Sequence, residues 1–77
     1  MKVAILGPGC PKCKATEKAV RQAVEELGVE ATIYKVEDIR EIMNFRVMLT
    51  PAVVIDDEVK IAGRVPTVEE IKSLICL

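Results

Sequence analysis

The sequence predicts an α/β fold in which a four-stranded mixed sheet is flanked by three helices. The run "KVAIL" at 2–6 is continuously apolar after its lysine, which is typical of a strand covered on both faces. Residues 13–27 carry apolar side chains at helical spacing. The short apolar runs "AVVI" (52–55) and "VKIA" (59–62) flank an acidic turn and predict a hairpin. For a chain of 77 residues we expect one domain, spanning 1–77.

The first helix is expected directly after the first strand and a short glycine-rich loop. Pro11 can open this helix, because proline lacks an N–H that would be unpaired in a first turn anyway. Gly28 is a favourable residue for ending it. The apolar side of the helix consists of Ala19, Val20, Ala23, Val24 and Leu27.

The second half of the chain continues with a strand, a helix, the hairpin and a last helix. "EATIYKV" (30–36) contains β-branched residues that favour a strand, and 37–45 predicts a short helix with an acidic start. Ile39, Ile42 and Met43 form one side of that helix. Thr67 and Glu70 predict a capping box for the last helix. A helix joins the first two strands, so these strands should be parallel, and the hairpin adds an antiparallel pair.

Composition and charge exclude several classes of partner. The net charge is −1 and aromatic residues make up 3%, which argues against electrostatic attraction to nucleic acid and against base stacking. The residues before Gly7 are too few for a signal-peptide core or a membrane span. We therefore expect a cytoplasmic monomer that binds neither nucleic acid nor a membrane and needs no cofactor.

Cys10 and Cys13, in the stretch "CPKC", are the candidate functional residues. A close cysteine pair in a reducing compartment is more often catalytic or metal-binding than structural, and three cysteines do not make a disulfide framework. The main alternative is a soft-metal module, because thiolates bind Cu(I) and zinc. Closed zinc sites use about four ligands, and this chain has no histidine and only Cys76 besides the pair. A two-coordinate Cu(I) site or a dimer stays open.

The predicted position of Cys10 favours its thiolate. It falls between the first strand and the start of the first helix, where free N–H groups and the helix dipole stabilise an anion. Lys12 and Lys14 add positive charge, and cysteines at such positions have pKa values of about 3.5–7.5. Cys13 lies one turn into the helix on its less polar side, so it should be less exposed. A nucleophilic thiolate beside a second thiol is what a dithiol–disulfide exchanger needs.

Over nearly its whole length the chain resembles the thioredoxin superfamily, in particular the small redox-active disulfide proteins of archaea and anaerobic bacteria. The resemblance lies in "CPKC" (10–13), "TP" (50–51) and the glycine of "IAGRVP" (61–66). It implies a thioredoxin-like βαβαββα fold and a protein dithiol–disulfide oxidoreductase. Its clients would be protein disulfides, and a thioredoxin-reductase-type enzyme would reduce it.

The resemblance also implies a role for each matching residue. Cys10 would attack and Cys13 would resolve the mixed disulfide. Pro51 would follow a cis peptide bond and face the pair, and the backbone of Thr50 would bind a peptide. Supporting positions are Pro11, Lys12 and Gly63.

Two departures from the family pattern concern the surroundings of the cysteines. Gly9 stands where thioredoxins usually have a tryptophan. The first strand also lacks the buried acid that helps to deprotonate the second cysteine in thioredoxins, so water or Lys12 would handle that proton. A single glycine, Gly63, replaces the paired glycines that glutaredoxins use around glutathione, which argues against glutathione as the substrate.

Overall fold

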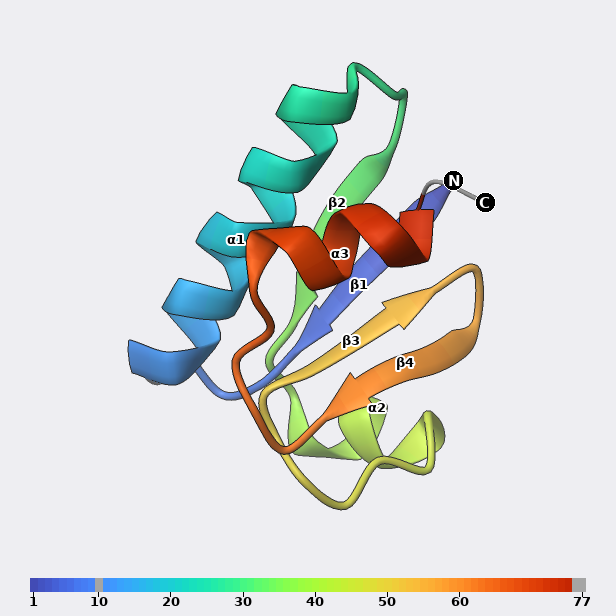
Figure 1. The fold of residues 1–77 in the computed structure, drawn as a ribbon. Helices are drawn as coiled ribbons and strands as arrows, with labels where there is room; N and C mark the ends of the chain where they lie inside the picture. Colours follow the sequence, from blue (N-terminus) through green and yellow to red (C-terminus); the bar gives the residue numbers. More distant parts are fainter. Residues whose placement is uncertain (10, 76–77) are drawn as a thin grey trace.

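The computed structural model describes residues 1–9 and 11–75 and has the predicted order of strands and helices. Figure 1 shows the chain from its N-terminal strand, in blue, to its C-terminal helix, in red. The elements are β1 (Lys2–Leu6), α1 (Pro11–Leu27), β2 (Thr32–Val36), α2 (Ile39–Asn44), β3 (Ala52–Ile55), β4 (Glu58–Ala62) and α3 (Val68–Ile75).

The four strands form one mixed sheet in the order β2-β1-β3-β4. β1 and β2 are parallel, as the helical connection between them predicts. β3 lies antiparallel to β1 and forms the predicted hairpin with β4. The two central strands are the most apolar, and every residue of β3 is buried. Continuous apolar runs are needed here because both faces of these strands are covered.

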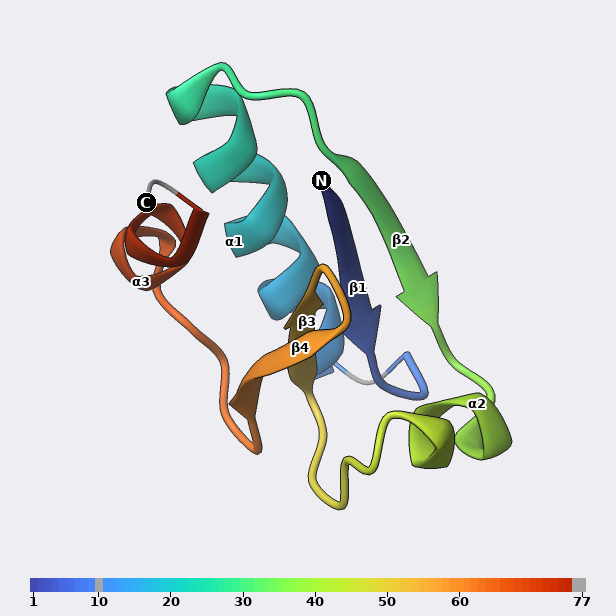
Figure 2. The same ribbon diagram turned by 90° about the vertical axis from the view of Figure 1, so that its right-hand side faces the viewer.

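Helices cover the sheet on both faces (Figure 2). α1 and α3 pack on one face over side chains such as Val3, Ile5 and Val53, and α2 lies against the other face. The alternation of side chains along β1 places Ala4 and Leu6 on the α2 side. The result is a three-layer α/β structure, consistent with a thioredoxin-like fold.

The short helix α2 departs from its predicted pattern. It spans six residues rather than the whole of 37–45, and Asp38 caps its start by accepting a hydrogen bond from the Arg40 N–H. Of its predicted apolar side only Ile42 is buried, whereas Ile39 and Met43 are each 65% exposed. A helix of less than two turns presents only one row of side chains to the sheet, which leaves the others at the surface.

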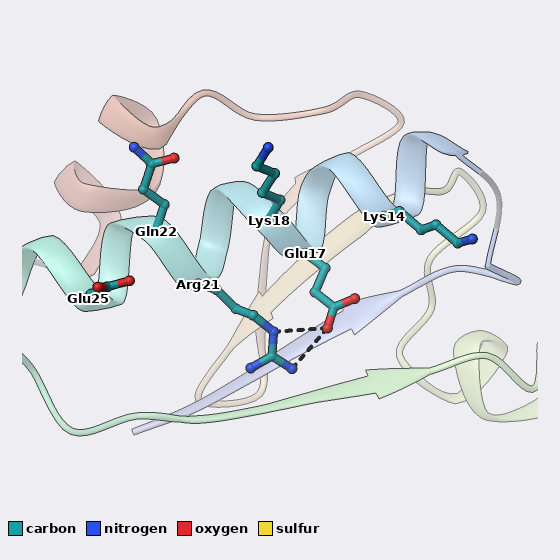
Figure 3. A pocket seen from close by; sticks show the side chains of 6 residues that line it. All are labelled: Lys14, Glu17, Lys18, Arg21, Gln22 and Glu25. Carbon is teal, nitrogen blue, oxygen red and sulfur yellow. Dashed lines mark hydrogen bonds and ion pairs between the residues drawn. The ribbon is translucent and has the colours of Figure 1, made fainter.

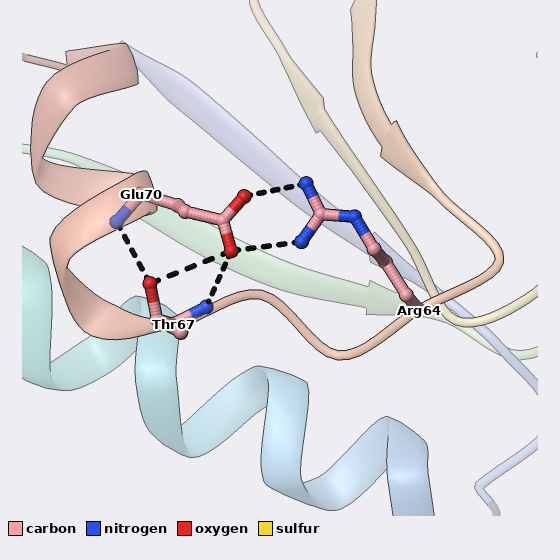
Figure 4. Close-up of polar contacts among 3 residues, drawn as sticks. All are labelled: Arg64, Thr67 and Glu70. Carbon is pink, nitrogen blue, oxygen red and sulfur yellow. Dashed lines mark hydrogen bonds and ion pairs between the residues drawn. The ribbon is translucent and has the colours of Figure 1, made fainter.

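The capping box at the start of α3 forms as predicted (Figure 4). The Glu70 N–H donates to Thr67 Oγ1 at 3.1 Å, and the Thr67 N–H donates to Glu70 Oε1 at 3.2 Å. The guanidinium of Arg64 donates two hydrogen bonds to the same carboxylate, one of 2.8 Å. Arg64 and the Thr67 backbone together lower the pKa of Glu70 to about 2.

Candidate functional site

The strand register brings four loops to one end of the sheet. β1 and β2 both finish there, and a hydrogen bond of 2.9 Å from the Gly7 N–H to the Val36 carbonyl holds the two ends together. β3 is antiparallel to β1, so Leu6 pairs with Ala52 and Pro51 lies at the same end. Ala52 also pairs with Ala62 of β4, so Gly63, the residue after Ala62, lies at this end as well. Segments far apart in sequence therefore meet at the carboxyl end of β1.

Cys13 lies at this end, one turn into α1, and is only 6% exposed. This agrees with the prediction that it faces the less polar side of the helix. Its sulfur lies over Gly7: a β-carbon on Gly7 would be 2.2 Å from Cys13 Sγ and 3.9 Å from Thr50 Cβ. The same glycine thus contacts the cysteine segment and the segment before Pro51.

Cys10 and Cys76 lie outside the described residues, so the predicted position of the attacking thiol stays a prediction. The helix α1 begins at Pro11, the position that the sequence indicates. Pro11 and Lys12 are exposed in its first turn.

The segment around Pro51 also lies at this end of the sheet. The Thr50–Pro51 peptide bond is cis. Thr50 is exposed and Pro51 is buried. The Gly63 N–H donates a hydrogen bond of 2.9 Å to the Pro51 carbonyl, and a β-carbon on Gly63 would be 3.2 Å from Leu49 Cβ. Gly63 also has a φ of 82°, which favours glycine.

A polar cleft of about 260 Å³ opens beside Cys13. Its charged side chains are Lys14 and Glu17 from α1, Lys35 from β2 and Glu37 after β2. Its remaining lining consists of Ile5, Gly7, Pro8, Gly9 and Cys13.

Lys35 links the two carboxylates of this cleft. Its Nζ lies 3.6 Å from Glu17 Oε1 and 3.9 Å from Glu37 Oε1. Arg21 binds the other carboxylate oxygen of Glu17 at 2.9 Å. The hydrogen bond from Arg21, followed by the charge of Lys35, holds the pKa of Glu17 below its ordinary value. Glu17 is therefore ionised at neutral pH.

An apolar groove of about 310 Å³ lies next to Thr50. Pro8 and Thr50 form the part nearest the cysteine loop, and α2 and the loop after it supply the rest: Ile39, Ile42, Met43, Val47 and Met48. Met48 is 93% exposed, an unusual degree for a large apolar side chain. The groove at the surface is thus lined in part by the predicted apolar side of α2, which consists of Ile39, Ile42 and Met43.

A shallow depression of about 500 Å³ follows the outer face of α1. Figure 3 shows its side chains projecting from that face, with Arg21 paired to Glu17. The other residues that line it are Lys14, Lys18, Gln22 and Glu25. Charged residues at i and i+4 are typical of a solvated helix face. We therefore assign no function to this depression.

Within the described part of the chain, no cluster of side chains has the make-up of a metal site. Residues 1–9 and 11–75 contain no group of three or more His, Cys, Asp or Glu side chains that could hold a metal ion. No helix within those ranges is both long and apolar enough to cross a bilayer.

Sequence reasoning missed Gly7, Glu17, Lys35 and Glu37 as neighbours of Cys13. The sequence contains a signal for Glu17, because it follows Cys13 by four residues and residues at that spacing lie on one face of a helix. Lys35 and Glu37 reach the cleft only through the parallel pairing of β2 with β1.

Residues 1–76 match the family model described as a thioredoxin domain. The chain is 50% identical to the protein named Thioredoxin from Methanocaldococcus jannaschii over 71 residues, which cover 92% of this chain and 81% of that protein. It is 40% identical to the Thioredoxin of Methanothermobacter thermautotrophicus over 75 residues, or 97% of both chains. A Probable Thioredoxin of Archaeoglobus fulgidus is 38% identical over 71 residues, 88% of this chain and 77% of that protein. With this match over nearly its full length, the chain belongs to the thioredoxin family.

Proposed function

We propose that this thioredoxin-like redox protein is a protein dithiol–disulfide oxidoreductase, in which Cys10 attacks and Cys13 resolves. The observation that carries the proposal is the placement of Cys13. Its thiol is buried one turn into α1, three residues after Cys10, at the sheet end where Thr50 and Pro51 also lie. A buried thiol reacts poorly with a large substrate in solution but well with a neighbouring disulfide.

The reaction takes place in two exchanges. The Cys10 thiolate attacks one sulfur of a client disulfide, the client S–S bond breaks, and one client sulfur leaves as a thiolate. Cys13, once deprotonated, attacks the Cys10 sulfur of the mixed disulfide and releases the second client thiolate. The protein gains a Cys10–Cys13 disulfide, the client gains two electrons, and the client thiolates take up protons.

The partners follow from this balance. A protein that leaves each cycle oxidised needs a dithiol-regenerating enzyme, and we assign that role to a thioredoxin-reductase-type partner. The apolar groove next to Thr50 supports protein clients rather than a small charged thiol, because it offers apolar area for a peptide on either side of its disulfide.

The soft-metal alternative has less support. The order of this chain's elements is βαβαββα, whereas small soft-metal carriers of the CxxC type have a strand directly after the second strand, in the order βαββαβ. The groove and the Thr50–Pro51 segment also have no function in such a carrier.

Trapping of clients tests the assignment of the two cysteines. We expect a Cys13→Ser variant to accumulate mixed disulfides with clients, because Cys10 can attack but nothing releases the product. A Cys10→Ser variant should trap few clients, and Cys76→Ser serves as the matched control that should behave as the unmodified protein. More trapping by Cys10→Ser than by Cys13→Ser would reverse the roles. Absence of trapping by both would overturn the proposal.

A further inference from the structure

The resolving step requires Cys13 to lose a proton in a place that bulk water reaches poorly. Only the thiolate attacks a disulfide, and an ordinary cysteine has a pKa of about 8.5. Cys13 is only 6% exposed, so few water molecules can reach its thiol to take the proton. Resolution at neutral pH would therefore benefit from a proton acceptor close to the sulfur.

The cleft beside Cys13 contains two such acceptors and two cations. The charged groups that line it are Lys14 and Glu17 on α1, Lys35 on β2 and Glu37 after β2. Among the described residues, the sheet and loop segments that complete its wall bring no further charge, since these are Ile5 and the stretch 7–9. At neutral pH only the carboxylates can take up a proton.

Glu17 is the better placed of the two carboxylates. It follows Cys13 by four residues on α1, so the two β-carbons lie about 5–6 Å apart on one helix face. Its side chain is 19% exposed, compared with 55% for Glu37. Glu37 instead lies toward the loop, with Oε2 3.5 Å from the position of a β-carbon on Gly9. A cleft of about 260 Å³ has room for several water molecules at about 30 Å³ each, so one water can bridge the thiol and the carboxylate.

We infer that Glu17 accepts the proton of the Cys13 thiol when Cys13 resolves the mixed disulfide, an inference that rests on the proposed function. The proton passes from Cys13 Sγ to the Glu17 carboxylate, directly or through one water. The sulfur then attacks the Cys10 sulfur, the Cys10–client bond breaks, and the client sulfur leaves with the electron pair. The proton on Glu17 returns to solvent or to the departing thiolate, which completes the balance.

Lys35 and Arg21 each pair with one carboxylate oxygen of Glu17. Arg21 holds one carboxylate oxygen from the outer face of α1, and Lys35 holds the other within the cleft. Of the two, only Lys35 lines the cleft.

If Glu17 accepts the proton, its removal should slow resolution, whereas a purely electrostatic effect of its charge predicts faster resolution. A negative charge beside a thiol raises the pKa of that thiol, so removal of the charge would speed resolution. A purely structural role would affect Glu17 and its partner Arg21 alike. The sign of the rate change and the comparison with Arg21 therefore separate the three roles.

The experiment follows the reaction of the reduced protein with Ellman's reagent in stopped flow, in a Cys76→Ser background so that only the pair reacts. The first thionitrobenzoate is released by Cys10 at a rate that depends on reagent concentration. The second is released by Cys13 at a rate that does not. Without a concentration-independent second release in the background protein, the proposed function itself fails.

In Glu17→Gln we expect the first release to be nearly unchanged and the second to slow by about 10²-fold at neutral pH. The slowed rate should rise with pH, because hydroxide or water must then remove the proton that Glu17 no longer accepts. The second rate of the background protein should vary little over the same range, because Glu17 is already ionised there.

Two variants control this result. Glu25→Gln removes the same charge from the exposed face of the same helix, away from the cleft, and should leave both rates unchanged. Arg21→Gln removes the ion-pair partner but keeps the carboxylate, and should not slow the second release. An unchanged or faster second release in Glu17→Gln, or an equal slowing in Arg21→Gln, would overturn the inference.

Discussion

The sulfur of Cys13 occupies the space that a side chain on Gly7 would need. A β-carbon at Gly7 would lie 2.2 Å from Cys13 Sγ, closer than β-carbons approach other atoms without a shift, and 3.2 Å from Cys13 Cβ, which is already a tight contact. Gly7 follows the end of β1, and Cys13 lies near the start of α1. The absence of a side chain at Gly7 therefore lets the buried thiol approach the end of the sheet.

Gly7→Ala should destabilise the protein by about 1–3 kcal/mol, the usual cost of adding a methyl group to a packed interior. Urea denaturation of the reduced protein measures it. The double variant with Cys13→Ala should be less destabilised than the sum of the two single variants, because the sulfur that causes the clash is gone.

Gly28→Ala is the control for this coupling. Its φ of 65° makes alanine costly there as well, but no atom lies within 4 Å of the new methyl group. Its effect should therefore add to that of Cys13→Ala. Strictly additive effects of Gly7→Ala and Cys13→Ala would contradict the predicted contact.

The hairpin turn between β3 and β4 contains a site for stabilisation. Asp56 and Asp57 have φ values of 48° and 68°, a region in which a side chain is strained. Asp57→Gly should raise the free energy of unfolding by about 0.5–1 kcal/mol, after the added flexibility of the unfolded chain is subtracted.

Asp56→Gly is the matched comparison at the neighbouring position. Asp56 Oδ1 accepts a hydrogen bond of 2.9 Å from the Lys2 N–H, which glycine cannot replace. We therefore expect no stabilisation from Asp56→Gly. Thermal melts of both variants provide the check, and a lower melting temperature for Asp57→Gly than for the unmodified protein would contradict the prediction.

The contacts of Glu70 should make stability depend on pH in the acid range. Arg64 and the Thr67 backbone lower the pKa of Glu70 from 4.5 to about 2 in the folded protein. A depressed pKa means that the ionised form stabilises the fold above the unfolded value, and that this stabilisation is lost as the pH falls from 4.5 toward 2.

Glu70→Gln isolates that effect, because glutamine keeps the capping-box position without the charge. The difference in unfolding free energy between the unmodified protein and Glu70→Gln should be largest near neutral pH. It should shrink across the acid range, and salt should reduce it as well. Denaturation curves recorded at several pH values measure it, and a difference that does not vary with pH would refute the assignment.

The exposed methionines of the apolar groove should matter for protein clients only. Met43 and Met48 are 65% and 93% exposed and lie beside Thr50. Changing both to serine should lower kcat/KM for reduction of insulin disulfides by about tenfold, because apolar contact area with the client is lost.

The same double variant should react with Ellman's reagent at the rate of the unmodified protein, since that small disulfide needs no groove. Val29→Ser, at an exposed apolar residue on the loop after α1, is the control and should change neither rate. Equal losses with insulin and with Ellman's reagent would mean that the groove does not bind clients.

The order of strands and helices and the bounds of β1 and β3 follow from the sequence alone. Local chemistry is sufficient for these features: apolar runs predict buried strands, Pro11 and Gly28 mark the two ends of α1, and Thr67 with Glu70 caps α3. The spacing of Cys10 and Cys13 likewise indicates the proposed chemistry. Such signals lie within a few residues of one another, so they do not depend on how distant segments pack.

The surroundings of Cys13, by contrast, depend on tertiary packing. Lys35 and Glu37 reach its cleft because β2 pairs in parallel with β1, and a shift of that register by one residue would turn their side chains to the other face. Likewise, the rotation of α1 over the sheet sets the sulfur of Cys13 against Gly7. The short α2 leaves Met43 in the groove instead of the core. Register, helix rotation and helix length are set by the packing of the whole core, which no local pattern specifies.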